Sequence, residues 1–357
     1  MRSCSEMPQL SVGCRSTSHA SSAPCSPGSQ RKTRSPAAEV QDGRMSVQLM
    51  PLPAERFDEW RSAARKRLID GNRASDRRPG VDAVAHVDQL FGEVFPGSAA
   101  TATARVMRVV MDAEGEVGTL LLILRDDKLF LLDLVVDEPF TDAHSDDLLA
   151  EILRVAREEG ATQVGMQLFP QDSTGRAFAS GRGFEVASIQ MVLEPLPARD
   201  VASHVDVSPM TPDRFPTFAA ASEEGFANDL VESGRYTPEE ALAESHRQMI
   251  AELPDGLDTA GQELFTASVD GTEVGILWVG VRQREGRPHV FVLDIEVAVE
   301  HRRRGYGREL MHAVEREARR LGADSIGLHV FGFNTGAIDL YEQLGYRRTE
   351  ESLLRDV

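Results

Sequence analysis

The stretch Val290-Phe-Val-Leu-Asp-Ile-Glu-Val-Ala-Val-Glu-His-Arg-Arg-Arg-Gly-Tyr-Gly-Arg-Glu-Leu-Met-His-Ala-Val-Glu315 predicts a strand, a turn and a helix in direct succession. Residues 290–299 are mostly β-branched or apolar, as in a largely buried strand. From Gly307 onward, apolar residues recur at helical spacing with charged residues between them, at Leu310, Met311, Val314, Ala318 and Leu321. We therefore expect a buried strand that leads into an amphipathic helix.

The turn between this strand and this helix, residues 302–307, contains three consecutive arginines and two glycines. Glycine lets the backbone approach a ligand closely, and the free N–H groups at the start of a helix attract anions. Arginine adds donors that suit phosphate oxygens. The turn predicts a polyphosphate-binding loop, although the spacing alone also fits a basic loop that only solvates the helix start.

Two segments downstream complete a familiar pattern. A second strand, Ser325-Ile-Gly-Leu-His-Val-Phe331, precedes Asn334-Thr-Gly-Ala-Ile-Asp-Leu-Tyr-Glu-Gln-Leu-Gly-Tyr346. With the Arg-x-x-Gly-x-Gly turn before them, their order and separation closely resemble the GNAT superfamily of acetyltransferases. The resemblance implies an α/β (α+β) fold with a mixed, mostly antiparallel central sheet flanked by helices. It also implies an acetyl-CoA-dependent N-acetyltransferase that works by direct attack in a ternary complex.

The resemblance also implies roles for individual residues. In this superfamily the glycine-containing turn holds the pyrophosphate of acetyl-CoA, an Asn lines the pantetheine arm, and a backbone N–H of the preceding strand stabilises the thioester oxyanion. The residues expected to bind the cofactor are Val297, Val299, Arg302, Arg303, Arg304, Gly305, Tyr306, Gly307, Arg308 and Asn334. Tyr341, in the last helix, is expected to protonate the leaving thiolate.

A catalytic base is also needed, because an alkyl amine with a pKa of about 10 is protonated at neutral pH. His329 lies where ribosomal-protein N-acetyltransferases of this superfamily have their catalytic Glu, and it could act through a water. Its other interpretation is a hydrogen-bonded histidine on a half-buried strand. Glu296 and Asp294 are competing bases, and either could instead pair with the nearby arginines.

The upstream part of the chain repeats this pattern. Gly160-Ala161 and Gly322-Ala323 are separated by the same 162 residues as Gly183-Phe184 and Gly345-Tyr346, which indicates an internal duplication. We expect a disordered tail at 1–45, a degenerate GNAT-like domain at 46–194, a linker at 195–206 and the catalytic domain at 207–357.

The first copy lacks the residues that the chemistry requires. Its counterpart of the arginine-glycine turn is Phe140-Thr-Asp-Ala-His-Ser, followed by two aspartates, so the charge is inverted. The position of Tyr341 falls on Ala179 and that of Asn334 on Asp172. We expect that this copy keeps the fold but does not bind CoA in the usual way.

The composition restricts the possible partners. The net charge of −18 argues against nucleic acid and anionic membranes, and it favours a small cationic amine or a basic peptide as acceptor. Seven acidic residues lie in the two helices expected to roof the acceptor site: Glu223, Glu224, Asp229, Glu232, Glu239, Glu240 and Glu244. The three cysteines all lie within the first 25 residues, and the nine histidines show no ligand spacing, so neither a nucleophilic cysteine nor a metal is expected.

No apolar run reaches the roughly 20 residues of a membrane span, and we expect a cytoplasmic protein that is a monomer or a homodimer. The main alternative to an enzyme is a CoA-responsive binding module, in which occupancy by acetyl-CoA changes how the two domains engage a partner. The presence of Tyr341 favours turnover.

Overall fold

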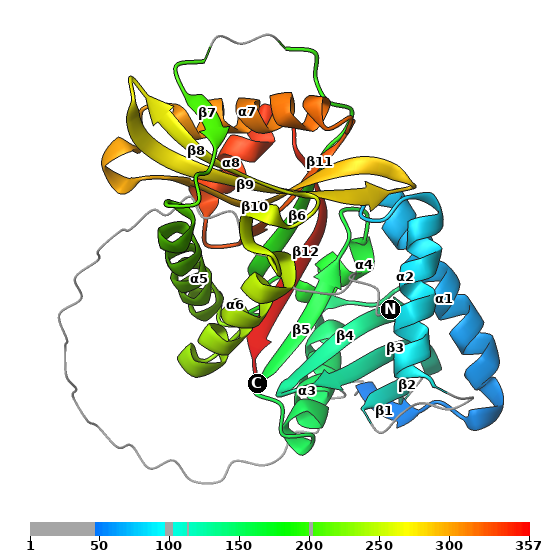
Figure 1. Ribbon diagram of the computed structural model, residues 1–357. Helices are drawn as coiled ribbons and strands as arrows, with labels where there is room; N and C mark the ends of the chain where they lie inside the picture. Colours follow the sequence, from blue (N-terminus) through cyan, green and yellow to red (C-terminus); the bar gives the residue numbers. More distant parts are fainter. Residues whose placement is uncertain (1–46, 97–102, 113, 200–202) are drawn as a thin grey trace, which may run out of the picture.

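The computed structural model describes residues 47–96, 103–112, 114–199 and 203–357, so the predicted tail at 1–45 lies outside the described residues (Figure 1). Both halves of the chain follow the same order of elements: a strand, two helices, three strands, a helix, a strand, a helix and a strand. The structure thus repeats the duplication that the paired glycines predicted.

The first half comprises β1 (Val47–Pro51), α1 (Phe57–Ala74), α2 (Gly80–Val94), β2 (Ala104–Met111), β3 (Gly115–Arg125), β4 (Lys128–Val136), α3 (Asp142–Glu158), β5 (Gln163–Leu168), α4 (Ser173–Ala179) and β6 (Glu185–Leu193). The second half comprises β7 (Asp206–Pro209), α5 (Phe215–Glu232), α6 (Pro238–Glu252), β8 (Gln262–Val269), β9 (Thr272–Arg284), β10 (Arg287–Val297), α7 (Tyr306–Arg320), β11 (Ile326–Phe331), α8 (Thr335–Leu344) and β12 (Arg347–Asp356). Short 3-10 turns occur at η1 (Ala54–Arg56), η2 (Gly256–Asp258) and η3 (Val299–His301).

The strands form a single twelve-stranded sheet in the order β1-β2-β3-β4-β5-β12-β6-β11-β10-β9-β8-β7. The expected mixed, mostly antiparallel sheet is confirmed, because among the strands of the described residues only β4 with β5 and β10 with β11 are parallel. The halves exchange their last strands: β12 pairs with β5 of the first half, and β6 pairs with β11 of the second. An unpaired edge exposes N–H and C=O groups, and the exchange covers the edges of β5 and β11. The two half-sheets are therefore continuous.

Each face of the sheet carries its own set of helices. Side chains alternate along β11, so that Leu328 and Val330 pack in one core with residues of α7 and α8, whereas Phe331 packs in another with residues of α5 and α6. The first half divides in the same way, with α3 and α4 in one core and α1 and α2 in the other. Because one sheet runs through both halves, α3, α4, α7 and α8 share one face, and α1, α2, α5 and α6 share the opposite one.

The sheet opens at one place in each half. Strands β10 and β11 are in register from Val290↔Ile326 to Val292↔Leu328 and then diverge. At the same point, β10 shifts its register against β9, between Val292 and Asp294. Such a bulge bends a strand and redirects the groups beyond it. Strands β4 and β5 diverge in the same way beyond Leu131↔Met166.

Candidate active site

The loop before α7 presents an uncapped helix start. Gly305 is the N-cap residue, with φ of 91° in the left-handed region, and no side chain caps the helix. A Cβ atom added to Gly305 would meet nothing within 4 Å, so space remains directly in front of the helix. The first N–H groups of a helix lack backbone partners and attract anions. The residues of this loop, including Tyr306 and Gly307 in the first turn of α7, therefore fit a phosphate-bearing ligand.

The arginines of this loop differ in the contacts that they make. Arg303 is exposed and makes no hydrogen bond or ion pair with the residues that the structure describes. Arg304 Nη2 donates to the Glu300 carbonyl oxygen at 3.2 Å, and Arg308 Nη2 donates to Gln343 Oε1 at 2.6 Å. Arg303 is thus the loop cation best placed to receive a ligand.

Arg302, by contrast, is turned inward. Its Nε donates to the Val297 carbonyl oxygen at 2.9 Å, and its Nη2 lies 3.3 Å from Glu296 Oε1. Its side chain is only 13% exposed, whereas that of Glu296 is 35% exposed. Arg302 therefore holds the end of β10, and its predicted contact with a cofactor remains a prediction.

The end of β10 directs a backbone N–H group toward the opening between β10 and β11. The N–H of Ala298 donates to the Val274 carbonyl oxygen at 2.9 Å. Hydrogen-bonded and non-hydrogen-bonded pairs alternate along an antiparallel ladder, so the N–H of Val297 points away from β9, to the side on which β11 has diverged. This direction suits the predicted oxyanion donor. Val299, next along the chain, is 66% exposed.

Helix α8 positions Asn334 and Tyr341. Asn334 is the N-cap residue, and its side chain accepts a hydrogen bond from the N–H of Ala337 at 3.3 Å. Tyr341 is buried in the same core as α7 and packs against Tyr346, with the ring centroids 5.8 Å apart. Tyr341 therefore lies on the face of the sheet that also carries the loop before α7.

His329 lies on the opposite face, at the opening between the strands. It is the residue after Leu328, which forms the last registered pair with β10. Its ring is buried beside Phe331, and its Nδ1 has no hydrogen-bond partner among the described residues. Burial, and to a smaller extent the charges of Arg235 and Arg77, lower the pKa of His329 to about 3. The imidazole is therefore neutral at pH 7.

The competing carboxylates are both engaged. Asp294 Oδ2 accepts a hydrogen bond from Ser222 Oγ of α5 at 2.6 Å, and Glu296 forms the ion pair with Arg302 described above. The sequence allowed pairing with arginine for both residues; the structure shows such a pair for Glu296 and a hydroxyl partner for Asp294.

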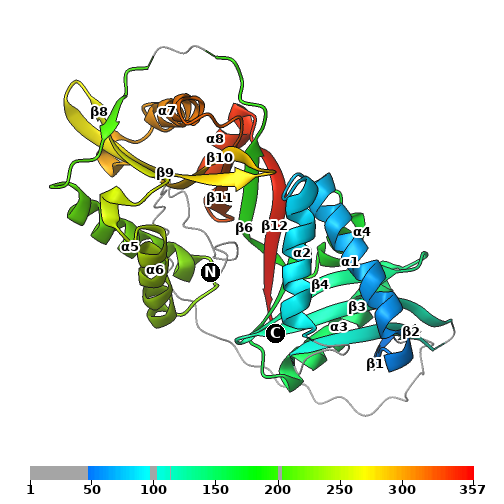
Figure 2. The same cartoon turned by 45° about the vertical axis from the view of Figure 1, so that its right-hand side comes forward.

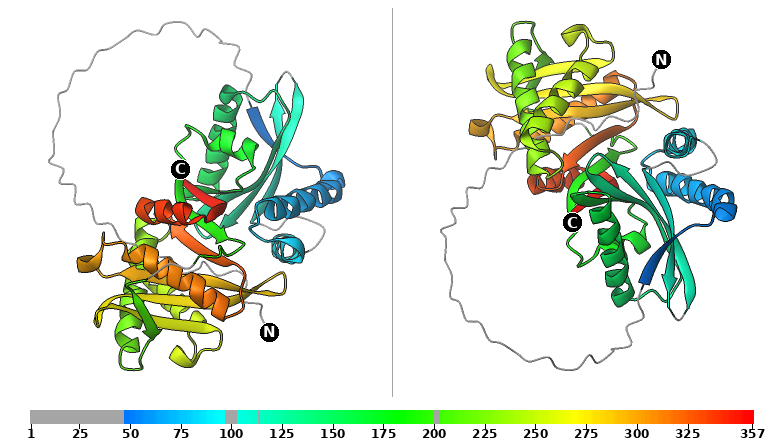
Figure 3. Two further views of the ribbon diagram at one scale, coloured as in Figure 1. Left: turned by 90° about the horizontal axis from the view of Figure 1, so that it is seen from above. Right: turned by 90° about the horizontal axis from the view of Figure 1, so that it is seen from below.

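A large cavity of about 810 Å³ lies on the His329 face, between the two halves. Figure 2 shows the α1–α2 and α5–α6 pairs on either side of the central strands β6 and β12. Residues of α2, α6, β6, β12 and the connections within both helix pairs line the cavity. Views from above and below show how the two halves meet along these strands (Figure 3). The cavity wall includes Arg77, Arg235, His86 and His289, none of which the sequence had indicated.

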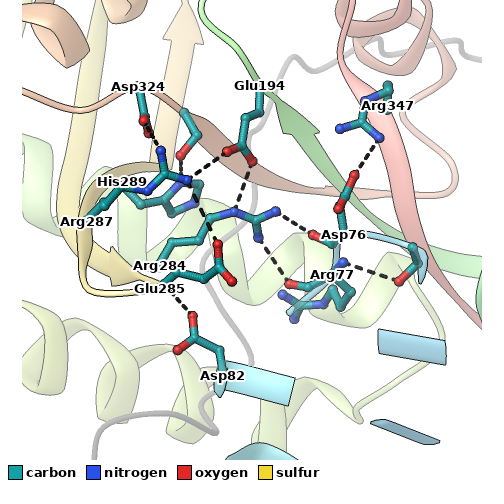
Figure 4. A network of polar contacts seen from close by, with 12 residues as sticks. Asp76, Arg77, Asp82, Glu194, Arg284, Glu285, Arg287, His289, Asp324 and Arg347 are labelled. Atoms are coloured by element: carbon teal, nitrogen blue, oxygen red, sulfur yellow. Dashed lines mark hydrogen bonds and ion pairs between the residues drawn. The ribbon is translucent and has the colours of Figure 1, made fainter. Parts of the chain in front are cut away.

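An ion-pair network ties the halves together at one end of the cavity (Figure 4). Arg284 Nε lies 3.2 Å from Glu194 Oε2, and Arg284 Nη2 donates to the Asp76 carbonyl oxygen at 2.7 Å. The Asp76 carboxylate in turn pairs with Arg347 at 3.0 Å. Because these contacts join α1–α2 to β9 and β12, they fix the wall of the cavity.

None of the seven acidic residues expected over the acceptor site lines this cavity. Glu244 pairs with Arg247 at 2.5 Å, Glu223 contacts His246 at 3.0 Å, and Glu240 completes the capping box of α6 with Thr237. The structure thus uses several of them to stabilise α5 and α6.

Among the described residues, no cluster of three or more His, Cys, Asp and Glu side chains is arranged to hold a metal ion. Over the same residues, no helix has both the length and the apolar character needed to cross a membrane.

Comparison with known proteins supports this description of the second half. Residues 229–346 match the model of the acetyltransferase (GNAT) family. An uncharacterized N-acetyltransferase of Bacillus subtilis, YycN, is 28% identical over 145 residues, which are 40% of this chain and 93% of that protein. A mycothiol acetyltransferase of Propionibacterium freudenreichii is 36% identical over 106 residues, 29% of this chain and 32% of that one.

Among solved structures, a tandem GNAT protein from the clavulanic acid biosynthesis pathway is 20% identical, with a TM-score of 0.40 over 87% of this chain and 98% of that one. The family match falls on the half that has the Arg-x-x-Gly-x-Gly turn and Tyr341, and the first half repeats its order of elements. Residues 229–346 thus match the GNAT family of acetyltransferases, and the chain is an acyltransferase in which the order of elements of this half occurs twice.

Proposed function

We propose that the protein is an acetyl-CoA-dependent N-acetyltransferase and that its second half transfers the acetyl group to a primary amine by direct attack in a ternary complex. The observation that supports this most is the opening between β10 and β11. The uncapped start of α7 and Tyr341 lie on one face of the sheet there, and His329 and the cavity lie on the other. A thioester and an amine could meet only where the sheet is open.

The residues around this opening have complementary tasks in the proposal. Acetyl-CoA supplies an activated acetyl group when it is bound. The N–H groups at the start of α7 and the guanidinium of Arg303 would hold its phosphates, as an anion site at a helix start does. The N–H of Val297 would stabilise the oxyanion, and Tyr341 would donate a proton to the leaving thiolate.

His329 is the base that we favour. Its neutral imidazole is in the protonation state that accepts a proton, its Nδ1 has no hydrogen-bond partner among the described residues, and the residue lines the cavity. The low pKa of His329, caused first by burial and then by the charges of Arg235 and Arg77, makes its imidazole a weak base in the free enzyme. Glu296 remains the second candidate, because its side chain is still partly exposed.

A thiol-release assay with acetyl-CoA and a panel of small amines and basic peptides tests the proposal, together with calorimetry of CoA binding. We expect one CoA per chain and acetylation of at least one amine class. Absence of CoA binding would contradict the proposal. CoA binding without thiol release from any amine would favour the CoA-responsive binding module instead.

A further inference from the structure

The cavity beside His329 holds a guanidinium that the described residues leave unpaired. Arg235, in the connection between α5 and α6, is half-buried and lines the cavity. It makes no hydrogen bond or ion pair with any residue that the structure describes, and burial lowers its pKa. Glu244, whose charge acts on Arg235, is itself paired with Arg247 at 2.5 Å. A desolvated, unpaired guanidinium is costly unless a ligand provides the missing acceptor.

The first half contributes an equivalent arginine. Arg77 lies in the connection between α1 and α2, directly after Asp76 with φ of 57°, just as Arg235 directly follows Gly234 with φ of 70°. The Nε of Arg77 is buried without a hydrogen-bond partner among the described residues, and the carboxylate with which it pairs is that of Glu350, at 3.6 Å. The duplication thus brings two arginines to one cavity, one from each half.

Most other charges on the cavity wall already have partners. Glu252 pairs with Arg282, and the Asp82 carboxylate accepts the N–H of Glu285 at 2.7 Å. Lys128 pairs with Asp127 at 2.8 Å, whereas Arg125, at the end of β3, is exposed and forms no ion pair with the described residues. After this pairing the cavity keeps a positive surplus that includes Arg235, although the whole chain has a net charge of −18.

The hydroxyl of Tyr236, beside Arg235, adds a further donor to this region. Tyr236 lines the cavity, and its hydroxyl forms no hydrogen bond with the described residues. A carboxylate or phosphate accepts several charge-assisted hydrogen bonds from a guanidinium and a hydroxyl at once.

We propose that the acceptor amine also carries an anionic oxygen group, a carboxylate or a phosphate, which Arg235 and Arg77 bind in the cavity between the two halves. This inference rests on the proposed acetyltransferase function and specifies the acceptor class of that same site. The anion would also offset the two charges that depress the pKa of His329, so binding of the correct acceptor would strengthen the base.

Anion binding is tested without knowledge of the acceptor. Acetate and inorganic phosphate are titrated into the full-length protein, and the ring-nitrogen NMR signals of His329 are followed after assignment with His329→Gln. We expect at least one anion to shift these signals, and Arg235→Gln to weaken its binding about 10- to 100-fold, the range of a charge-assisted hydrogen bond. Comparing acetate with phosphate shows whether the site prefers a carboxylate or a phosphate group.

Three variants make the result specific. Arg235→Lys keeps the charge and should retain part of the affinity, which shows that the site survives substitution. Arg77→Gln should weaken binding less than Arg235→Gln does, because Arg77 has Glu350 nearby. Arg303→Gln, which removes the unpaired arginine of the CoA loop, should leave the His329 shifts unchanged. Equal binding by the wild type and Arg235→Gln, or no shift with either anion, would overturn the inference.

Kinetics provide a second readout. Phosphoethanolamine is compared with ethanolamine, and an amino acid with its amide, at saturating acetyl-CoA. The anionic member of a pair should have at least tenfold higher kcat/KM, and Arg235→Gln should remove that preference. A preference for the neutral members would overturn the inference while leaving the acetyltransferase proposal intact. Failure to bind CoA in a separate titration would instead count against the proposed function.

Discussion

The start of α7 and the start of α3 occupy equivalent places in the two halves, but only the start of α7 is open. Helix α3 begins with a capping box: the Thr141 side chain accepts the N–H of His144, and His144 Nδ1 accepts the N–H of Thr141. Arg182, buried between α4 and β6, donates to the Asp142 carbonyl oxygen at 2.7 Å and lies 2.8 Å from Asp146. In the first half, side chains therefore satisfy the donors that a phosphate would need.

The residues that match in both halves are mostly structural. Asp172 caps α4 as Asn334 caps α8, each accepting an N–H from the residue three positions later. Asp133 follows the bulge of β4 as Asp294 follows that of β10, but Arg67 neutralises the first whereas Ser222 contacts the second. The duplication thus preserved backbone geometry, and the halves differ in the side chains that would meet ligands.

The largest expected effect comes from Tyr341, whose position is Ala179 in the first half. Tyr341→Phe should lower kcat about 100-fold, because it removes the proposed general acid, and should leave CoA affinity nearly unchanged. The control is Tyr346→Phe, which copies Phe184 of the first half and removes a buried hydroxyl that has no partner among the described residues. We expect kcat of this control within about twofold of wild type. An equal loss of kcat and of CoA affinity in Tyr341→Phe would contradict the assignment of Tyr341 as the general acid.

The next effect concerns the open helix start. Gly305→Ala should weaken CoA binding tenfold or more by calorimetry, since its methyl group would enter the space before α7 and the left-handed backbone would be strained by about 1–2 kcal/mol. Gly322→Ala, at the other end of α7, has φ of 74° and equally open surroundings, so it has the same backbone cost. It should lower stability without changing CoA affinity. An equal loss of affinity in both variants would show that strain, and not the loop, is responsible.

The third comparison concerns stability and involves the two aspartates that follow the bulges of β4 and β10. Arg67→Met should lower the free energy of unfolding by about 3 kcal/mol, because it leaves the Asp133 carboxylate buried without its ion-pair partner. Ser222→Ala should cost about 1 kcal/mol, since Asp294 is partly exposed and water can replace the hydroxyl. Urea unfolding measures both values. Similar costs would mean that the two aspartates are equally buried in solution.

Much of the second half could be predicted from local sequence. The Arg-x-x-Gly-x-Gly turn, the strand before it and the helix after it are set by glycine conformation and apolar spacing, and all three lie where the pattern indicated. Helix α6 likewise begins at a local signal, the capping box of Thr237 and Glu240 with Pro238 between them. The equal spacing of Gly160 and Gly322 with Gly183 and Gly345 predicted the repeat, because each of these glycines has a positive φ that few other residues adopt.

What required the tertiary structure is how the halves meet. The sequence showed two similar units, but any strand with an open edge can accept a partner, so it could not indicate that β6 and β12 exchange places. Arg77 and Arg235 lie 158 residues apart in the sequence, and they line the same cavity only because the two halves exchange strands. Arg302 and Arg303 are adjacent in sequence, yet the fold turns one toward Glu296 and leaves the other exposed. Local propensity determined the elements and the loop, whereas non-local pairing decided the cavity and the charges that face it.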